Sequence, residues 1–174
     1  MNPAAEHGPS LTDARHRAIG FASVPLGHGV TAGTAVALQS ALPYDITTGR
    51  DDNGDGLNSD RPVGTGRNAG RGRASADLSA RLAWRRGFGG PAPAGPSGPQ
   101  VRLVRAGGDA NPLADMPGGT NTRRFGLELY AQVFNALNHT NGQAYGGVQA
   151  SPYFGHLVAA GPARRMEVGA RLTL

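Results

Sequence analysis

Residues 164–174 read Arg-Arg-Met-Glu-Val-Gly-Ala-Arg-Leu-Thr-Leu, and this stretch decides the fold class. Side chains alternate across an extended strand with a period of two. One face of this strand therefore carries the apolar residues Met166, Val168, Ala170, Leu172 and Leu174. The other face carries Arg165, Glu167, Gly169, Arg171 and Thr173. One apolar wall and one charged wall are typical of a strand in a transmembrane β-barrel, although a half-buried strand of a soluble sheet has the same period.

Four earlier segments have strand character, at residues 16–24, 30–39, 75–85 and 125–134, and the last two of these also place charged residues opposite the apolar face. Their lengths match the ~9–11 residues that a tilted strand needs to cross the bilayer core. The sequence therefore predicts an all-β fold, an antiparallel meander of about five long strands that forms the C-terminal part of a transmembrane β-barrel. Trp84 and Phe125 end two of the apolar rows, where interfacial aromatic residues are expected.

The segments between these strands are predicted to be loops of very different length. Residues 25–29 form a short turn, and the long Gly/Pro-rich loops cover residues 40–74, 86–124 and 135–163. Residues 101–104 have the character of a small extra strand. Residues 1–15 are expected to be a loop or disordered, and residues 16–174 to form one partial barrel.

The composition argues against an ordinary soluble domain. The chain has 174 residues, with 28 Gly, 13 Pro and a hydrophobic fraction of 39%. Few of these residues are large, so a compact globule would lack the material to fill its core. No apolar run approaches the ~20 residues that a membrane helix requires, which excludes helical spans.

Charge and cysteine content exclude several other classes. The 17 basic residues, all of them Arg, outnumber the 12 acidic ones and give a net charge of +5. Usage rich in Arg, Ala, Gly and Pro is what a GC-rich genome produces, and the Arg-Gly runs have no interleaved aromatic residues, so no nucleic-acid partner is expected. The absence of Cys excludes disulfides, thiolate metal sites and cysteine nucleophiles.

Three ordered stretches resemble the C-terminal barrel of TonB-dependent outer-membrane receptors, in particular the large Oar-like group. The first runs from residue 42 to residue 68 and contains Asp-Asp-Asn-Gly-Asp-Gly followed by Asn-Ser-Asp-Arg-Pro. The second, residues 133–141, is similar to the family's FN-x-x-N strand end. The third joins residues 151–155 to residues 162–165 and the last strand.

This resemblance implies a protein of the cell outer membrane that takes part in ligand binding and uptake, without catalysis. Such receptors have about 22 strands and a plug, so this chain is expected to be a fragment. Its partners would be outer-membrane lipid, the remainder of the parent barrel and its plug, and the TonB complex through N-terminal regions that this chain lacks. Residues 1–7 have no basic and apolar signal-peptide pattern, so export is expected to depend on a longer protein.

One loop carries a candidate calcium site. Residues 51–56 match the opening of a calcium-binding loop, D-x-N-x-D-G, in which alternate oxygen ligands converge on one ion. The candidate ligands are Asp51, Asn53, Asp55 and Asp60, although Pro62 occupies the position of the bidentate carboxylate. No other cofactor is expected. A soluble, secreted β-rich binding module with a calcium-stabilised loop is therefore the alternative to the barrel.

Catalysis has no support in the sequence. The histidines at positions 7, 16, 28, 139 and 156 lack metal-ligand spacing. The pattern G-x-G-x-x-A at residues 64–69 lacks the strand before it and the helix after it that dinucleotide binding requires. The charged residues on the polar strand faces, Arg81, Glu128, Glu167 and Arg171, are instead expected to face a lumen and to pair across neighbouring strands.

Overall fold

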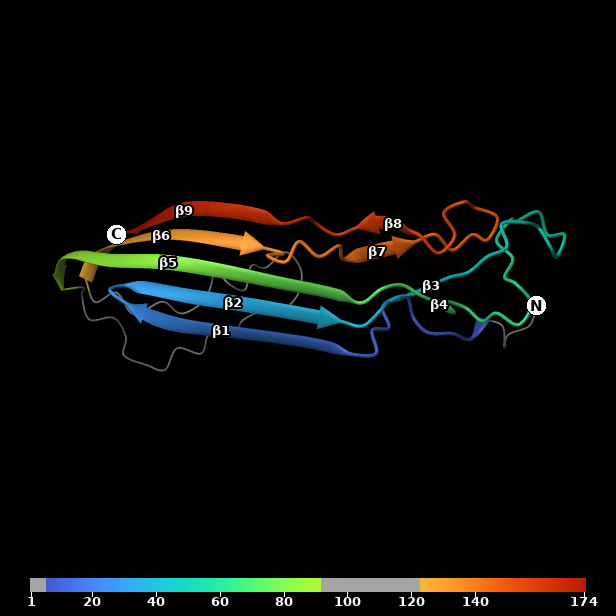
Figure 1. Cartoon of the computed structure of the whole chain (residues 1–174), viewed down its shortest axis with the longest axis horizontal. Helices are drawn as coiled ribbons and strands as arrows, with labels where there is room; N and C mark the ends of the chain where they lie inside the picture. The colour runs from blue at the N-terminus through green and yellow to red at the C-terminus, as the bar shows by residue number, and fades with distance from the viewer. Residues whose placement is uncertain (1–5, 92–122) are drawn as a thin grey trace. The chain divides into compact units, whose positions relative to one another are not determined.

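The computed structural model describes residues 6–91 and 123–174, and its regular elements are all strands. Five long strands form one sheet, in the order β1-β2-β5-β6-β9 (Figure 1). Their bounds are Arg17–Gly27 (β1), Val30–Gln39 (β2), Ser75–Pro91 (β5), Arg123–Phe134 (β6) and Arg165–Thr173 (β9). The predicted all-β meander of five long antiparallel strands is confirmed. In the part of the chain that the structure describes, β1 and β9 are the outer strands of the sheet.

The first hairpin differs from the prediction. Strand β1 continues through Pro25 to Gly27, so a turn over residues 25–29 was wrong, and only His28 and Gly29 separate it from β2. Both turn residues have positive φ, 51° at His28 and 81° at Gly29, as a two-residue hairpin turn of type I′ requires. Pro25 has no N–H to donate, and a strand at the edge of a sheet tolerates this loss.

Strands β5 and β6 are longer than the alternation indicated. Their pairing extends to Phe88 opposite Phe125, whose ring centroids lie 5.6 Å apart. The register then shifts before Pro91, next to Gly89 with a φ of 84°. This aromatic pair, and not Trp84, ends the apolar row, because Trp84 lies opposite Leu129 inside the sheet. The predicted extra strand at residues 101–104 lies outside the described residues.

Two predicted loops contain short strands. Pro43–Tyr44 (β3) pairs with Gly70–Arg71 (β4), and Gly142–Tyr145 (β7) pairs with Leu157–Ala160 (β8). Strands of two to four residues show too few alternations to be found from periodicity. Tyr44 and Tyr145 stack with their ring centroids 5.6 Å apart.

The chain divides into two compact units. The first, here called the loop unit, comprises the described parts of Met1–Ala18, Ala37–Ala76 and Asn138–Ala163. The second, the sheet unit, comprises those of Ile19–Val36, Asp77–Leu137 and Arg164–Leu174. None of the described segments forms an apolar helix of bilayer-spanning length.

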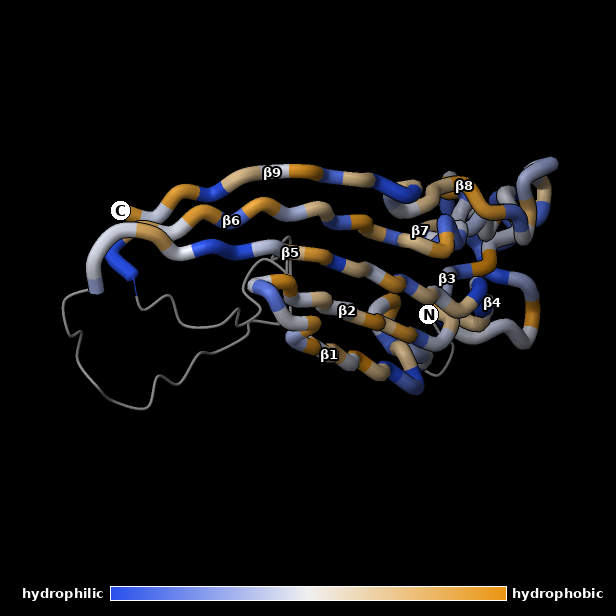
Figure 2. Tube along the Cα trace, turned by 60° about the vertical axis from the view of Figure 1, so that its left-hand side comes forward, coloured by the Kyte–Doolittle hydropathy of each residue, from blue (hydrophilic) through white to orange (hydrophobic). Residues whose placement is uncertain are grey.

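The sheet unit buries its polar face and exposes its apolar face. Leu82 of β5 is 51% exposed, Leu129 of β6 44%, and Val168 of β9 83%. The register aligns these rows, since Leu82 is opposite Ala131 and Ala131 is opposite Val168. Hydrophobic and hydrophilic residues accordingly alternate along β5, β6 and β9 (Figure 2). The described residues include only two buried hydrophobic ones, Ala35 and Ala83, so no described part of the chain covers this face.

Candidate functional site on the polar face of the sheet

The polar face of the sheet unit brings charged residues of three strands into two rows. Arg85, Glu128 and Arg171 form one row, because Glu128 of β6 is opposite Arg85 of β5 and Arg171 of β9. The second row, separated from the first by Ala83, Tyr130 and Gly169, places Gln132 between Arg81 and Glu167. The alternation of each strand selects the face, and the antiparallel register brings the complementary groups together.

Glu128 is the centre of an ion-pair cluster. Its Oε1 accepts a hydrogen bond of 2.7 Å from Nη2 of Arg81. Its Oε2 lies 3.2 Å from Nη2 of Arg85 and 4.0 Å from Nη1 of Arg171. The Arg81 and Glu128 side chains are 6% and 7% exposed. A pair this deeply buried is strongly coupled, because removing one partner leaves the other charge without compensation.

The remaining contacts of Arg81 fix its orientation. Its Nη1 donates to Oε1 of Gln132 at 3.2 Å, and its guanidinium carbon lies 4.0 Å from the centroid of the Tyr130 ring. Tyr130 in turn covers the backbone of Gly169, where an added Cβ would lie 2.5 Å from the ring. An aromatic ring over a glycine on the neighbouring strand is a known device for stabilising a sheet.

The sequence pattern predicted on which face of the sheet these charged residues lie, but it did not predict all of their partners. Arg81 and Arg171 lie across neighbouring strands from Glu128, as expected. The expectation was wrong for Glu167, which pairs with Arg165 of its own strand at 3.0 Å. The register places Gln132, not an arginine, opposite Glu167. The roles of Gln132 and Tyr130 depend on register, which periodicity within one strand does not provide.

The four candidate calcium ligands lie close together in the loop unit. Oδ1 of Asp51 accepts from the N–H groups of Gly54 and Asp55 at 2.7 and 3.0 Å, and its Oδ2 accepts from Gly56 at 2.9 Å. Oδ2 of Asp60 accepts from the N–H groups of Asp52 and Asn53 at 2.7 and 3.0 Å. These are the local side chain-to-backbone bonds that build a turn.

The amide of Asn53 also bonds within this loop. Its Nδ2 donates to Oδ2 of Asp55 at 3.1 Å and to Oδ1 of Asp60 at 2.7 Å, while its Oδ1 accepts from the N–H of Asp55 at 2.8 Å. The acidic oxygens are thus satisfied by donors of the loop itself. Over residues 6–91 and 123–174, no group of three or more His, Cys, Asp or Glu is placed to hold a metal ion. Calcium binding at Asp51, Asn53, Asp55 and Asp60 stays a prediction of the sequence.

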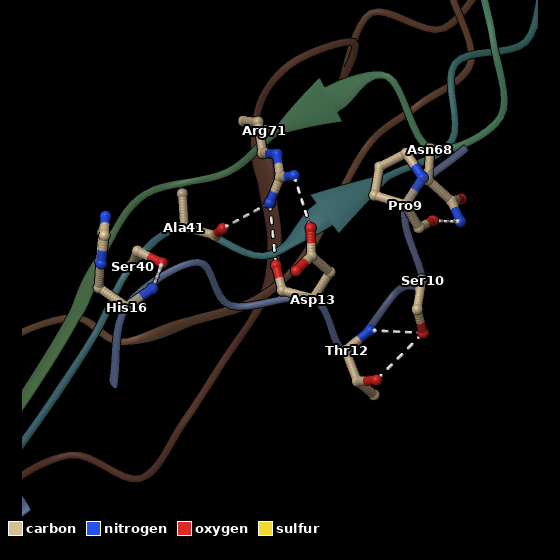
Figure 3. Close-up of polar contacts among 9 residues, drawn as sticks. All are labelled: Pro9, Ser10, Thr12, Asp13, His16, Ser40, Ala41, Asn68 and Arg71. Carbon is tan, nitrogen blue, oxygen red and sulfur yellow. Dashed lines mark hydrogen bonds and ion pairs between the residues drawn. The ribbon is translucent and has the colours of Figure 1, made fainter. Parts of the chain in front are cut away.

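The segment before β1 is a loop that polar contacts attach to the rest of the loop unit. Arg71 points between Asp13 and Ala41 (Figure 3), and its Nη1 donates to the carbonyls of both residues at 2.9 and 3.2 Å. Its Nη2 donates to Oδ2 of Asp13 at 2.9 Å. Asn68 is buried, and its Nδ2 donates to the carbonyl of Pro9 at 2.8 Å.

Arg61 makes a second attachment. It contacts Glu6 at 2.7 Å and Asp45 at 3.0 Å. The hydrogen bond from Arg61 and, next, its charge lower the pKa of the Glu6 carboxyl. The stabilisation from Glu6 is therefore present above the pKa of the unfolded carboxyl and is lost as the pH falls through the lower folded value. The hydrogen bonds to Glu6 and then Asp45 raise the pKa of Arg61, which stays charged throughout.

Replacing Arg71 with Gln is expected to lower the free energy of local opening of residues 6–16 by about 1 kcal/mol. The substitution removes three charge-assisted contacts at a partly exposed site. Hydrogen exchange of the amides in this segment measures the effect. Arg73→Gln is the matched control, because it removes the same charge at an exposed position two residues further on. Equal loss of protection in both variants would show that the Asp13 contacts do not hold the segment.

The motifs that carry the family resemblance have defined structural roles. Asn135 follows β6 with a φ of 46°, and Asn138 has a φ of 52°. Asn adopts this left-handed region more readily than most residues, which explains two Asn residues at this strand end. Asn68, with a φ of 53°, donates its N–H to Oδ1 of Asp45 at 3.0 Å.

Comparison of the chain with protein-family models, curated proteins and solved structures found no match.

Proposed function

We propose that this chain contributes five strands to a TonB-dependent, Oar-like β-barrel receptor of the outer membrane, which binds a ligand and takes it up. The observation that carries the proposal is the reversed polarity of the sheet unit. Apolar rows face outwards and a buried ion-pair cluster occupies the opposite face. In a membrane barrel the outward face meets lipid chains and the inward face meets a polar lumen.

The polar face supports the same proposal. A wall that contacts a lumen must satisfy its charged groups within the protein or with water, and Glu128 does so with arginines of β5 and β9. Among the described residues, no buried side-chain polar atom lacks a hydrogen-bond partner. Such a face suits the interior of a transporter, where polar side chains adjoin the path of a solute.

The open edges of the sheet explain why the proposal involves a larger barrel. The strands β1 and β9 are the outer strands of the described sheet, and an unpaired edge in hydrocarbon costs several kcal/mol per exposed backbone group. Further strands of a parent barrel would pair with these edges. Ligand uptake would then also require the plug and, through it, the TonB complex.

The alternative, a soluble binding module, has less support. A soluble sheet of this kind would hold its apolar rows beneath a second layer, which in a sandwich packs about 10 Å away. In the described part of the chain the rows on β5, β6 and β9 are exposed, including Met166 at 75%.

The single tryptophan gives a direct test of the membrane placement. Trp84 lies on the apolar face, opposite Leu129. We expect brominated phospholipids to quench most of its fluorescence when the chain is reconstituted into liposomes within its parent barrel, whose other tryptophans are replaced by Phe, because bromine on the acyl chains acts only at short range. Aqueous iodide should have little effect on the same sample.

The matched control moves the tryptophan to the other wall. In a Trp84→Phe background, Tyr130→Trp places the indole on the polar face, one register position away. This variant should respond weakly to brominated lipid and more strongly to iodide. If Trp84 is quenched by iodide and unaffected by brominated lipid, the apolar face meets water and the receptor proposal is rejected. Recovery of the native protein only in the soluble fraction of cells would reject it independently.

A further inference from the structure

The sheet unit contains a pocket between its strands. It has a volume of about 560 Å³ and lies at the end of the strands near the turn at His28 and Gly29. Its lining includes Thr31 of β2, Arg85 of β5, Glu128 of β6 and Arg171 of β9. Pockets of ~300–1,000 Å³ are the size that small-molecule sites usually have.

The lining of this pocket has an excess of positive charge. On the polar face two of its arginines, Arg85 of β5 and Arg171 of β9, flank Glu128 of β6, which is the single carboxylate among the described lining residues. Glu128 is already shared, since its closest contact is to the buried Arg81 at 2.7 Å. Arg171 lies 4.0 Å from the carboxylate and its side chain is 54% exposed. The single negative charge of Glu128 does not balance the positive charges of the arginines around it, so the electrostatic potential in the pocket is positive.

The geometry of the guanidinium groups indicates which charge would compensate this field. Arginine presents N–H donors in a planar fork that matches the oxygens of a carboxylate or a phosphate. Arg85 is held in place by its 3.2 Å contact to Glu128. Arg171 is held less closely, because its contact to Glu128 is 4.0 Å long and its side chain is 54% exposed. The Arg85 and Arg171 guanidinium groups thus share the Glu128 carboxylate, and a second oxyanion could bind to the donors that Glu128 leaves unused.

We propose that this pocket binds the carboxylate or phosphate group of a small anionic solute. The inference rests on the proposed receptor function, for which it names the chemical class of ligand. Arg85 and Arg171 hold the anion, and Glu128 orients both side chains. The source is a solute and not a lipid headgroup, because these side chains lie on the polar face, opposite the rows that would contact lipid.

Isothermal titration of inorganic phosphate and of acetate into the full chain tests this proposal. The chain is refolded in a non-ionic, phospholipid-free detergent at low ionic strength. Saturable binding of at least one of the two anions is expected, and glucose should give none. Absence of saturable binding of both anions would overturn the proposal. Binding of the chain to anionic phospholipid, without binding of either free anion, would also overturn it, because the ligand would then be a lipid headgroup.

A pair of variants separates a defined site from general attraction. Arg171→Gln is expected to weaken binding about tenfold, the effect of losing one charge-assisted hydrogen bond of about 1.4 kcal/mol. Arg165→Gln removes the same charge from the same face of the same strand, outside the pocket lining, and should change the affinity less than about twofold. Equal weakening by both variants would mean that net charge alone attracts the anion, which rejects the site.

Failure of this proposal can be distinguished from failure of the proposed function. The Trp84 quenching experiment reads the lipid-facing wall and does not depend on anion binding. A chain with Trp84 quenched by brominated lipid and no anion saturation rejects the pocket and keeps the receptor. If the chain binds an anion saturably but Trp84 is not quenched by brominated lipid, the membrane placement is rejected. The pocket would then have no role in uptake across a membrane.

Discussion

Replacing Leu129 with Arg is expected to lower the free energy of unfolding in a lipid bilayer by about 2–4 kcal/mol. Leu129 lies in the middle of β6, between Trp84 of β5 and Ala170 of β9, and its side chain is exposed on the apolar face. If that face contacts hydrocarbon, the guanidinium must be buried in a medium that solvates it poorly. On a water-exposed face the same substitution would cost no more than about 0.5 kcal/mol.

Urea titration of the parent barrel refolded in liposomes, with Trp84 as its sole tryptophan and its fluorescence as the signal, measures this effect. The matched control is Val63→Arg, which introduces the same side chain at a fully exposed apolar position in the loop unit. Its unfolding free energy should stay within about 0.5 kcal/mol of the parent chain. If Leu129→Arg behaves as Val63→Arg does, the apolar wall is not in contact with lipid.

Glu128→Gln is expected to lower the free energy of unfolding by about 3 kcal/mol, because it leaves the buried Arg81 without a counter-charge. Glutamine keeps the shape and one acceptor oxygen, so the loss comes from charge and not from a cavity. Repulsion among Arg81, Arg85 and Arg171 adds to it, since the carboxylate that separates them becomes neutral.

The control for this variant is Glu167→Gln on the neighbouring strand. Glu167 lies on the same face and pairs with Arg165, but both side chains are much more exposed, so a loss of at most about 1 kcal/mol is expected. A double-mutant cycle with Arg81→Gln isolates the Arg81–Glu128 term. Similar losses for Glu128→Gln and Glu167→Gln would contradict a special role for the buried cluster.

Alternation within single strands was enough to predict the long strands of this fold. On β9 it separated Met166 and Val168 from Glu167, and the structure keeps this separation. The prediction was less accurate where a single residue is compatible with both a turn and a strand. Pro25 indicates a turn in most contexts, yet it lies inside β1, an outer strand of the described sheet, and the order of strands in a sheet is not visible in a sequence.

The candidate sites were predictable in part, for a related reason. The sequence placed Arg81, Glu128 and Arg171 on polar faces, but their contacts depend on register, which is a property of strand pairs. The pocket near Thr31 and Arg171 also depends on it, because its lining comes from β2, β5, β6 and β9. The acidic loop was recognisable because its residues are close in sequence, and Asp51 indeed bonds to Gly54, Asp55 and Gly56.

The scarcity of buried apolar residues in the described parts has a thermodynamic consequence. Soluble domains gain a heat capacity of ~12–15 cal/mol/K per residue on unfolding, because their interior side chains become hydrated. Here Ala35 and Ala83 are the buried hydrophobic residues that the structure describes. When amphiphile covers the remaining apolar side chains in both the folded and the unfolded states, this increment becomes small. In such an environment the stability of the chain would vary almost linearly with temperature, without the cold-denaturation limit that a hydrated interior imposes.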